Sequence, residues 1–468
     1  MSRGMRIGRE IHMTAIGGVG MSSLAGLLVA QGHRVRGSDL DVYPPASDEL
    51  ARLGVPVRKG YAAENLEPRP DLVVMGNAIS ADNPEAVAAR RRGIPTLSLP
   101  EALELLLLPG RTPLVVAGTH GKTTTASFLA WVLETAGRAP GWFIGGAPRD
   151  LAAGYALGTG EEFVLEGDEY DSAYFDKGPK FLHYRPAALV LNAVEFDHAD
   201  IYRDLAHVKQ SFARLLGLLP SAAPLLVCAD FPHAVAVARE SGARYATFGS
   251  SGADWVTEDL SDGPAGLRFV ARGPGESFAV GSPLLGRMNA RNLLGVAALA
   301  RRLGVPVDAI QRAAETFHGV RRRQEVVVDG AITLIDDFAH HPTAIAATLE
   351  AVRARYPGRV VRALFDPRSN TTRRRIFQDE IATALAGADH VLFGPVHRAA
   401  LLDVSDRFSP DEACAKIASL GSTAVSIEEH GALAERVLAE AKAGDVVVVL
   451  SNGAFGGIVQ RLKEGLAK

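Results

Sequence analysis

The segment at residues 118–125 constrains this chain more than any other feature. It reads Gly-Thr-His-Gly-Lys-Thr-Thr-Thr and joins an apolar run, Pro113 to Ala117, to a long helical pattern that ends near Ala136. We expect the apolar run to be a buried strand. A glycine turn between a strand and a helix lets backbone N–H groups and the helix N-terminus hold a phosphate. The sequence therefore predicts an α/β domain that binds a nucleotide.

Two side chains of this loop have expected roles at a nucleotide. Lys122 would bring a positive charge to the β- and γ-phosphates, and the hydroxyl of Thr123 would reach a magnesium ion. The usual phosphate-loop pattern has a glycine where this chain has Val116, so only the shortened form Gly-Thr-x-Gly-Lys-Thr is present. The residues expected to contact the nucleotide are Gly118, Thr119, His120, Gly121, Lys122, Thr123 and Thr124.

Length and pattern together predict three α/β domains. The chain has 468 residues, and domains of roughly 150 residues are common. Each of three sections opens with an apolar strand followed by a helix, which predicts parallel sheets. We place the domains at residues 1–108, 109–324 and 325–468, with Pro109-Gly110 at the first boundary and an arginine run near the second.

Composition excludes several classes of protein. The net charge of −3 gives no general attraction to nucleic acid. Only Cys228 and Cys414 are cysteines, which excludes a disulfide framework and suits a reducing cytoplasm. Arg3, Arg6 and Arg9 precede an apolar stretch that glycines interrupt, so we expect no signal peptide. The expectation is a cytoplasmic protein with no membrane partner.

Acidic groups follow two expected strands of the second section. The cluster Glu166-Gly167-Asp168-Glu169 follows the run Phe163 to Leu165, and Asn-Ala-Val-Glu-Phe-Asp-His-Ala-Asp at residues 192–200 follows another run. Carboxylates at strand ends near a phosphate loop can hold Mg²⁺, which prefers oxygen ligands. Open α/β sheets bind ligands at the carboxyl ends of their strands. Both clusters are therefore candidates for a metal site, although solvated acidic loops look the same in sequence.

Polar motifs also mark the later part of the chain, and each has an ordinary structural explanation beside a functional one. An Asn-Ala-Arg-Asn stretch could cap a helix, a triple arginine could be a solvated face, and a His-His-Pro could start a helix. Two loops that follow apolar strands could be simple connections. These motifs occupy residues 289–292, 321–323, 336–342, 366–371 and 451–457.

The first section contains a partial dinucleotide-binding pattern. Gly17-Gly18-Val19-Gly20 follows an expected strand and opens a helix, and Asp39 ends the next strand. The third glycine of the full pattern is replaced by Ser23. The pattern alone therefore leaves an NAD-dependent dehydrogenase as one alternative.

The motifs together resemble the Mur ligases over nearly the whole chain. The resemblance rests on the shortened phosphate loop, on Asn-x-x-x-x-Asp-His-x-Asp at residues 192–200, and on Asp-Asp-Phe-x-His-His-Pro at 336–342. It implies an N-terminal Rossmann-like domain that binds a UDP-sugar, a central ATP-binding domain, and a C-terminal Rossmann-like domain that contacts the amine substrate and the nucleotide. It also implies an ATP-dependent carboxylate–amine ligase that uses ATP and Mg²⁺ in peptidoglycan synthesis and recycling.

The resemblance assigns a role to each candidate residue. Thr123, Glu166 and His198 would hold magnesium, with Glu166 shared between two ions, and Lys122 and Arg323 would act on the transferring phosphate, with Arg322 as second choice. Asn289 and Asn292 would meet the adenine and Asp337 the ribose, although Met288 and Phe338 replace the histidine and tyrosine of relatives. The residues expected at the substrates are Gly18, Gly20, Met21, Ser22, Ser38, Asp39, His340, Arg368, Asn370, Thr371, Ser451 and Asn452.

Two loops favour one branch of this family. Pro-Arg-Ser-Asn-Thr at 367–371 and Ser-Asn-Gly-x-Phe-Gly-Gly at 451–457 are similar to the branch that attaches the tripeptide L-alanyl-γ-D-glutamyl-meso-diaminopimelate to UDP-N-acetylmuramate. The long stretch from Tyr170 to Pro186 favours the same branch, and the branch that adds free L-alanine is the alternative. A dehydrogenase would leave the Lys122 loop unused, and a non-catalytic nucleotide-binding module would leave the loops of a third domain unused.

Overall fold

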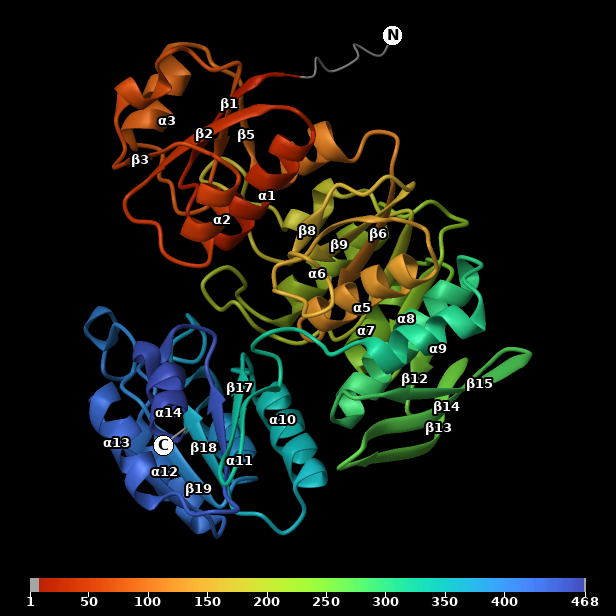
Figure 1. The fold of residues 1–468 in the computed structure, drawn as a ribbon, viewed down its shortest axis with the longest axis vertical. Coiled ribbons are helices and arrows are strands. Elements are labelled where there is room, and N and C mark those ends of the chain that lie inside the picture. Colours follow the sequence, from red (N-terminus) through yellow and green to blue (C-terminus); the bar gives the residue numbers. More distant parts are fainter. Residues whose placement is uncertain (1–7, 467–468) are drawn as a thin grey trace. The chain divides into compact units, whose positions relative to one another are not determined.

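The computed structural model describes residues 8–466, so Arg3 and Arg6 lie outside the described residues. The chain forms two compact units, and Figure 1 shows its helices and strands as a ribbon. Among the described residues, one unit contains residues 8–194 together with Ala206–Phe248 and Gly295–Ala313. The other contains Glu195–Leu205, Gly249–Leu294 and residues 314–466.

The first unit begins with a parallel five-stranded sheet in the order β3-β2-β1-β4-β5. Its strands are β1 (Glu10–Thr14), β2 (Arg34–Asp39), β3 (Val57–Lys59), β4 (Leu72–Met75) and β5 (Thr96–Ser98). Its helices are α1 (Val19–Ala30), α2 (Ala46–Arg52), η1 (Ala63–Leu66), α3 (Pro84–Arg91), α4 (Leu99–Ala102) and the π-helix η2 (Leu103–Leu107). The βαβ alternation expected for this section is confirmed.

The second sheet of this unit carries the phosphate loop. Its strand order is β12-β11-β10-β6-β9-β7-β8, and only β8 is antiparallel to its neighbour. The strands are β6 (Thr112–Ala117), β7 (Gly141–Phe143), β8 (Tyr155–Ala156), β9 (Glu162–Gly167), β10 (Ala188–Leu191), β11 (Leu225–Cys228) and β12 (Ala246–Gly249). The helices that follow along the chain are α5 (Lys122–Thr135), η3 (Lys180–His183), α6 (Leu205–Leu216), α7 (Pro232–Glu240), α8 (Arg287–Arg302) and α9 (Val307–Thr316).

The second unit holds an antiparallel meander and the C-terminal sheet. The meander is β13 (Trp255–Gly263), β14 (Gly266–Gly273) and β15 (Glu276–Ser282). The six-stranded sheet has the order β16-β17-β21-β18-β19-β20, and only β16 runs antiparallel. Its strands are β16 (Glu325–Asp329), β17 (Thr333–Asp337), β18 (Val361–Phe365), β19 (His390–Phe393), β20 (Thr423–Ser426) and β21 (Val446–Leu450).

Helices cover both faces of the C-terminal sheet. They are α10 (Pro342–Arg355), η4 (Arg375–Phe377), α11 (Gln378–Leu385), η5 (Ala399–Leu401), α12 (Pro410–Ser419), α13 (His430–Glu440), η6 (Phe455–Gly457) and α14 (Ile458–Leu466). Alternate residues of β21 enter opposite cores: Val446, Val448 and Leu450 pack with α10, α11 and α12, whereas Val447 and Val449 pack with α13 and α14. Burial on both faces explains why this strand is an unbroken valine run.

The meander was not expected from the sequence. In β13 only Trp255 and Val256 are buried, and the other positions of the strand are partly covered or exposed. Such a strand lacks the continuous apolar run that marks the parallel strands. Within residues 8–466, no helix is long and apolar enough to cross a membrane.

The stretch from Tyr170 to Pro186 packs inside the first unit. Ser98 Oγ donates a hydrogen bond of 2.7 Å to Asp176, and His183 lies 3.0 Å from Asp176 and 3.2 Å from Glu104. These contacts tie η3 to the residues around α4. The link between the length of this stretch and the tripeptide branch stays a prediction.

Candidate active site

Glycines shape the phosphate loop between β6 and α5. A Cβ on Gly118, whose φ is +137°, would lie 2.9 Å from the backbone N and O of Ala193, so a side chain has no room. The N–H of Thr119 donates to the carbonyl of Ala193 at 2.7 Å, and Gly121 begins α5 with φ 79°. Val116 is fully buried inside β6, which explains why the loop begins later than the usual pattern. The predicted strand–loop–helix context is confirmed.

Lys122 is a buried positive charge held beside the loop. Its Nζ donates to the Gly118 carbonyl at 2.8 Å and to Glu169 Oε2 at 2.7 Å, and its side chain is 10% exposed. Burial opposes the charge, but Glu169, Asp168 and Glu166 outweigh burial and raise the pKa of Lys122. The lysine therefore stays protonated. Glu169 was not singled out from the sequence, although it lies in the acidic cluster that was.

The structure brings Glu166 together with Thr123. Glu166 Oε1 accepts a hydrogen bond of 2.6 Å from Thr123 Oγ1, and Oε2 accepts one of 2.8 Å from the N–H of Gly145. Burial and the neighbouring Asp168 raise the pKa of Glu166. A buried carboxylate that faces a hydroxyl in this way offers the oxygen ligands that Mg²⁺ prefers. The donor set therefore fits the predicted metal.

His198 belongs to the second unit, where Asp197 organises its surroundings. Asp197 Oδ1 accepts hydrogen bonds from Thr371 Oγ1 at 2.8 Å and from the N–H of His198 at 2.7 Å, and Oδ2 lies 3.6 Å from His340 Nε2. Burial acts against ionisation, but His340, His198 and His341 hold the pKa of Asp197 well below its usual range. Asp197 is thus an ionised carboxylate among histidines, and its position inside the Asp-His motif was the available sequence signal.

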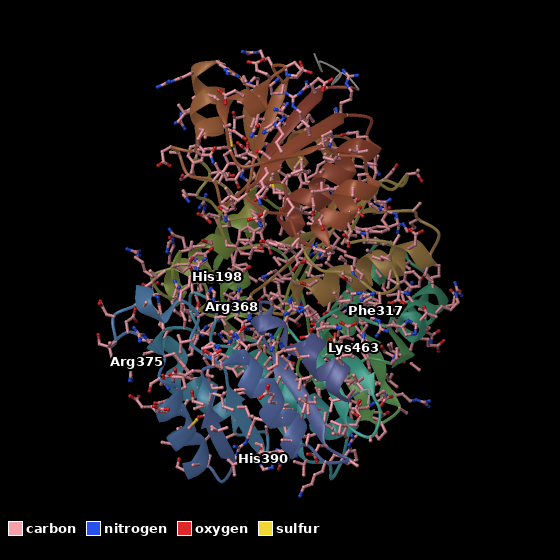
Figure 2. The ribbon with its side chains drawn as sticks, turned by 60° about the vertical axis from the view of Figure 1, so that its left-hand side comes forward. His198, Phe317, Arg368, Arg375, His390 and Lys463 are labelled. Carbon is pink, nitrogen blue, oxygen red and sulfur yellow. The ribbon has the colours of Figure 1, made fainter. Side chains whose placement is uncertain are left out.

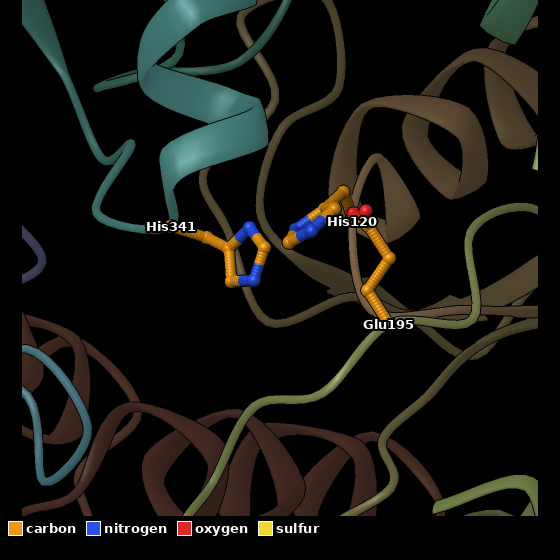
Figure 3. Close-up of side chains that lie close together, drawn as sticks. All are labelled: His120, Glu195 and His341. Carbon is orange, nitrogen blue, oxygen red and sulfur yellow. The ribbon is translucent and has the colours of Figure 1, made fainter. Parts of the chain in front are cut away.

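Two further polar residues, Glu195 and His341, also lie in this unit near the start of α10 (Figure 3). The ring of His341 accepts a hydrogen bond from the N–H of Thr343 through Nδ1 and donates one of 3.2 Å to the Phe196 carbonyl through Nε2. Glu195 Oε1 accepts from Thr343 Oγ1 at 3.1 Å. His341 thus caps α10, which agrees with the helix-start explanation of the His-His-Pro motif. His120 lies in the phosphate loop of the first unit.

Asp337 is a buried carboxylate at the end of β17. Its oxygens accept backbone N–H bonds from Ala339 at 2.6 Å and from Gln324 at 2.8 Å, and burial raises its pKa in spite of the neighbouring Arg323. Asn289 Nδ2 donates to Gln324 Oε1 at 3.1 Å. A second asparagine, Asn292, donates to Asn289 at 3.2 Å. The structure thus gathers the residues predicted for adenine and ribose around Gln324, and their contacts with a nucleotide stay predictions.

Arg322 and Arg323, which lie just before β16, have different surroundings. Arg322 Nη2 donates to the carbonyls of Ser451 at 2.8 Å and Gly453 at 2.6 Å, which ties this guanidinium to the loop after β21. Arg323 lies over the ring of Phe338, 4.6 Å from its centroid. Arg322 therefore has a role in shaping that loop. Arg323 remains our choice for the γ-phosphate.

The predicted substrate residues of the C-terminal domain lie on adjoining loops. Ser451 is buried, and its Oγ donates to Asp366 at 2.8 Å; Asn452 follows it in the same loop. Asn370 donates to Asp200 at 2.8 Å, next to the Thr371–Asp197 bond. Arg368 and His198, labelled in Figure 2, come from the two segments that these bonds join.

The N-terminal glycine turn is held by Asp39. The carboxylate accepts a hydrogen bond of 2.7 Å from the N–H of Gly17, while Gly18, Gly20, Met21 and Ser22 open α1. Ser38 is fully buried, and its hydroxyl donates to Glu85 at 2.7 Å. That hydroxyl is therefore committed to the interior of the sheet. Any contact of Ser38 with a uridine would come from its backbone.

We expect Glu169→Ala to destabilise the protein by about 3 kcal/mol, because removing one partner of a buried ion pair leaves an uncompensated charge. The thermal midpoint of unfolding measures the loss. A non-hydrolysable ATP analogue should raise the midpoint more for the variant than for the wild type, since a phosphate replaces the missing carboxylate. Equal midpoints for both proteins without nucleotide would contradict this account of Lys122.

A phosphate loop with a buried lysine and an adjacent carboxylate, set among α/β sheets, defines an enzyme that uses a nucleoside triphosphate. Three family models match the chain: "Mur ligase family, catalytic domain" over residues 10–110, "Mur ligase middle domain" over 116–300, and "Mur ligase, glutamate ligase domain" over 322–453. The chain belongs to the Mur ligase family. It is therefore an ATP-dependent ligase with the expected three-domain α/β architecture.

Individual relatives match over nearly the full length. The UDP-N-acetylmuramate–L-alanyl-gamma-D-glutamyl-meso-2,6-diaminoheptandioate ligase of Escherichia coli (strain K12) is 40% identical over 466 residues, 98% of each chain. A UDP-N-acetylmuramate–L-alanine ligase of Variovorax paradoxus (strain S110) is 34% identical over 471 residues, 97% of this chain and 95% of the relative. The crystal structure of a murein peptide ligase from Psychrobacter arcticus superposes with a TM-score of 0.75 at 35% identity, covering 98% of this chain and 99% of that one.

Proposed function

We propose that this chain joins the tripeptide L-alanyl-γ-D-glutamyl-meso-diaminopimelate to the lactyl carboxylate of UDP-N-acetylmuramate, with conversion of ATP to ADP and phosphate. The observation that carries the proposal is the 40% identity over 98% of both chains with a ligase named for these substrates. Two L-alanine ligases are 34% and 38% identical to this chain, the second over 93% of it. The reaction belongs to the bacterial cytoplasm, where ATP and UDP-sugars are found together.

In this proposal each domain binds a different ligand. Residues 1–108 bind the UDP-sugar through the glycine turn that Asp39 holds. Residues 109–324 bind ATP on the phosphate loop. Residues 325–468 contact the amine substrate and the nucleotide, through loops at the carboxyl ends of their strands.

The reaction proceeds through an acyl phosphate. An oxygen of the lactyl carboxylate attacks the γ-phosphorus, the bond to the β-phosphate oxygen breaks, and ADP leaves. The neutral α-amine of the peptide then attacks the acyl carbon, phosphate leaves, and the nitrogen loses a proton as the amide forms. The chain supplies positive charge through Lys122, which the structure keeps protonated, and through Arg323. A nucleophilic side chain is not required.

Magnesium would be held by oxygen ligands next to the phosphate loop. Thr123 and Glu166 are the residues that fit this role. His198, which offers a ring nitrogen, is a metal ligand only by the family resemblance. A bound Mg²⁺ would neutralise charge on the phosphate oxygens. Glu166 positions the Thr123 hydroxyl through their 2.6 Å hydrogen bond.

Product analysis tests this proposal. With UDP-N-acetylmuramate, ATP and the tripeptide present, the mass of UDP-N-acetylmuramyl-tripeptide should appear together with one phosphate per product. Omitting either the UDP-sugar or the peptide should stop phosphate release. Turnover without the UDP-sugar, or a failure to consume the tripeptide, would overturn the proposal.

Calorimetry tests the N-terminal domain separately. We expect the full-length protein to bind UDP-N-acetylmuramate and to show no heat of binding with NAD, because the glycine pattern lacks its third glycine at Ser23. Asp39→Ala should weaken the binding of the UDP-sugar, because the turn at Gly17 loses the carboxylate that accepts its N–H hydrogen bond. Asp41→Ala is the matched control, because Asp41 pairs at the surface with Lys59. Preferential binding of NAD would contradict the domain assignment.

A further inference from the structure

Three loops meet at the carboxyl edge of the C-terminal sheet, where β21, β18 and β19 are neighbours. The N–H of His397, in the loop after β19, donates to the Pro367 carbonyl, in the loop after β18, at 3.0 Å. Ser451, after β21, donates to Asp366 at 2.8 Å. The loops are therefore tied to one another at the edge where open α/β sheets bind ligands.

Arginines on this edge lack an acidic partner. Among residues 8–466, no hydrogen bond or ion pair engages the side chains of Arg368, Arg373 and Arg398, and the buried Nε of Arg373 has no acceptor. Two neighbours along the chain differ: Arg374 pairs with Asp406 and Arg375 with Glu412. Guanidinium groups without a carboxylate partner are suited to hold an anionic ligand.

The three guanidiniums act on one histidine. Burial, Arg368, Arg398 and Arg373 all lower the pKa of His397, and Asp366 acts in the opposite direction. Asp366 is buried, and burial raises its pKa although Ser451 and the nearby cationic groups oppose the rise. Besides burial, the arginines therefore act together against protonation of the His397 imidazole. A carboxylate bound there would stabilise the protonated imidazole.

Local geometry constrains two of these arginines, Arg368 and Arg398. A Cβ on Gly453 would lie 2.1 Å from Nε of Arg368, so the side chain of Arg368 passes directly over Gly453 and would have to move if that position carried a side chain. Arg398 has φ 50° and ψ 40°, a left-handed conformation that is unfavourable for any residue with a side chain. Such strained positions occur preferentially at binding sites.

We propose that Arg398 is a specificity-determining residue that binds one carboxylate of the peptide, beside a second carboxylate that we expect Arg368 to bind. This inference rests on the proposed function, because the tripeptide carries several carboxylates: one on the γ-linked D-glutamate and two on meso-diaminopimelate. Free L-alanine carries one. A cluster of arginines without acidic partners matches the tripeptide and exceeds what L-alanine needs.

Steady-state kinetics of the full-length protein test the role of Arg398. Arg398→Ala should raise the KM for the tripeptide about 10- to 100-fold, the range expected for a hydrogen bond to a charged group. The KM values for ATP and UDP-N-acetylmuramate should change less than twofold. Arg398→Lys should recover part of the loss, and Arg375→Ala, whose arginine pairs with Glu412, serves as the control (Figure 2). A larger effect on the KM of the UDP-sugar would overturn the proposal.

Altered peptides identify the carboxylate. One peptide carries L-lysine in place of meso-diaminopimelate, a second has the α-carboxylate of D-glutamate converted to an amide, and a third has a C-terminal amide. For the peptide that lacks the carboxylate bound by Arg398, Arg398→Ala and the wild type should have the same KM. For the other peptides, Arg398→Ala should still raise the KM. An equal penalty for all peptides would mean that Arg398 acts only on the fold.

An NMR titration provides a readout that does not depend on turnover. Arg398→Ala should raise the pKa of His397, assigned with His397→Gln, because one of the charges that lower it is gone. Saturating tripeptide, with UDP-N-acetylmuramate and a non-hydrolysable ATP analogue, should also raise this pKa in the wild type. An unchanged pKa in both experiments would contradict the inference. If the wild type does not use the tripeptide at all, the proposed function fails; if it does and Arg398→Ala behaves like wild type, only this inference fails.

Discussion

Replacing Lys122 by alanine is expected to lower kcat for ligation about 10²- to 10³-fold, the loss found when one electrostatic donor to a developing charge is removed. In the structure neighbouring carboxylates raise the pKa of this buried lysine, and Gly118 and Glu169 hold it within reach of the phosphate loop. The measurement is phosphate release under saturating substrates. Near-wild-type turnover would show that the loop does not act on ATP as described.

Two controls separate catalysis from folding in this experiment. Lys122→Ala leaves the buried carboxylate of Glu169 without its ammonium partner, so some loss of stability is expected. The double variant Lys122→Ala/Glu169→Ala removes both charges, and it should be equally inactive but unfold at a higher temperature than either single variant. Lys463→Ala, at an exposed position of α14, should behave like wild type.

Glu166→Gln is expected to reduce turnover about a hundredfold at fixed magnesium, since a bound divalent cation contributes several kcal/mol to phosphoryl transfer. Glutamine has nearly the same shape and can still accept the hydrogen bond from Thr123, so the fold should persist. The magnesium titration should shift to higher concentrations. Because burial raises the pKa of Glu166, protons should compete with magnesium in the wild type more strongly as the pH falls, and the variant should lose this dependence.

A matched carboxylate serves as the control for this prediction. Asp168→Asn removes a nearby charge whose side chain pairs with Lys180 at 3.2 Å. It should shift the magnesium titration less than Glu166→Gln. Titrations for Glu166→Gln that overlay the wild type would mean that Glu166 is structural only.

Much of the parallel core could be predicted from sequence, because strands buried on both faces are continuous apolar runs. The expected strands Pro113 to Ala117 and Phe163 to Leu165 lie within β6 and β9, and the phosphate loop lies between β6 and α5 as predicted. The antiparallel strands β13 to β15 could not be predicted in the same way. Their buried residues are widely spaced, and pairing along the chain, which sequence periodicity does not show, holds them together.

Residues that act through partners distant in sequence were the hardest to predict. Glu169 lies 47 positions from Lys122, and Thr371 lies 174 positions from Asp197, so no local pattern reveals either contact. The buried Ser38 shows the opposite difficulty. The resemblance placed Ser38 at the UDP-sugar, but its hydroxyl donates to the buried Glu85. Assignments made by resemblance therefore located the motifs, while the structure showed which side chains already have partners.

The choice of amine substrate tests the central claim most directly. The purified full-length protein is given UDP-N-acetylmuramate and ATP with magnesium, and kcat/KM is measured for the tripeptide L-alanyl-γ-D-glutamyl-meso-diaminopimelate and for free L-alanine. We predict the higher kcat/KM for the tripeptide, because the arginine-bearing loops at the carboxyl edge of the C-terminal sheet provide several positions for carboxylates. A higher kcat/KM for L-alanine would contradict the account and make the chain an L-alanine-adding member of the Mur ligase family.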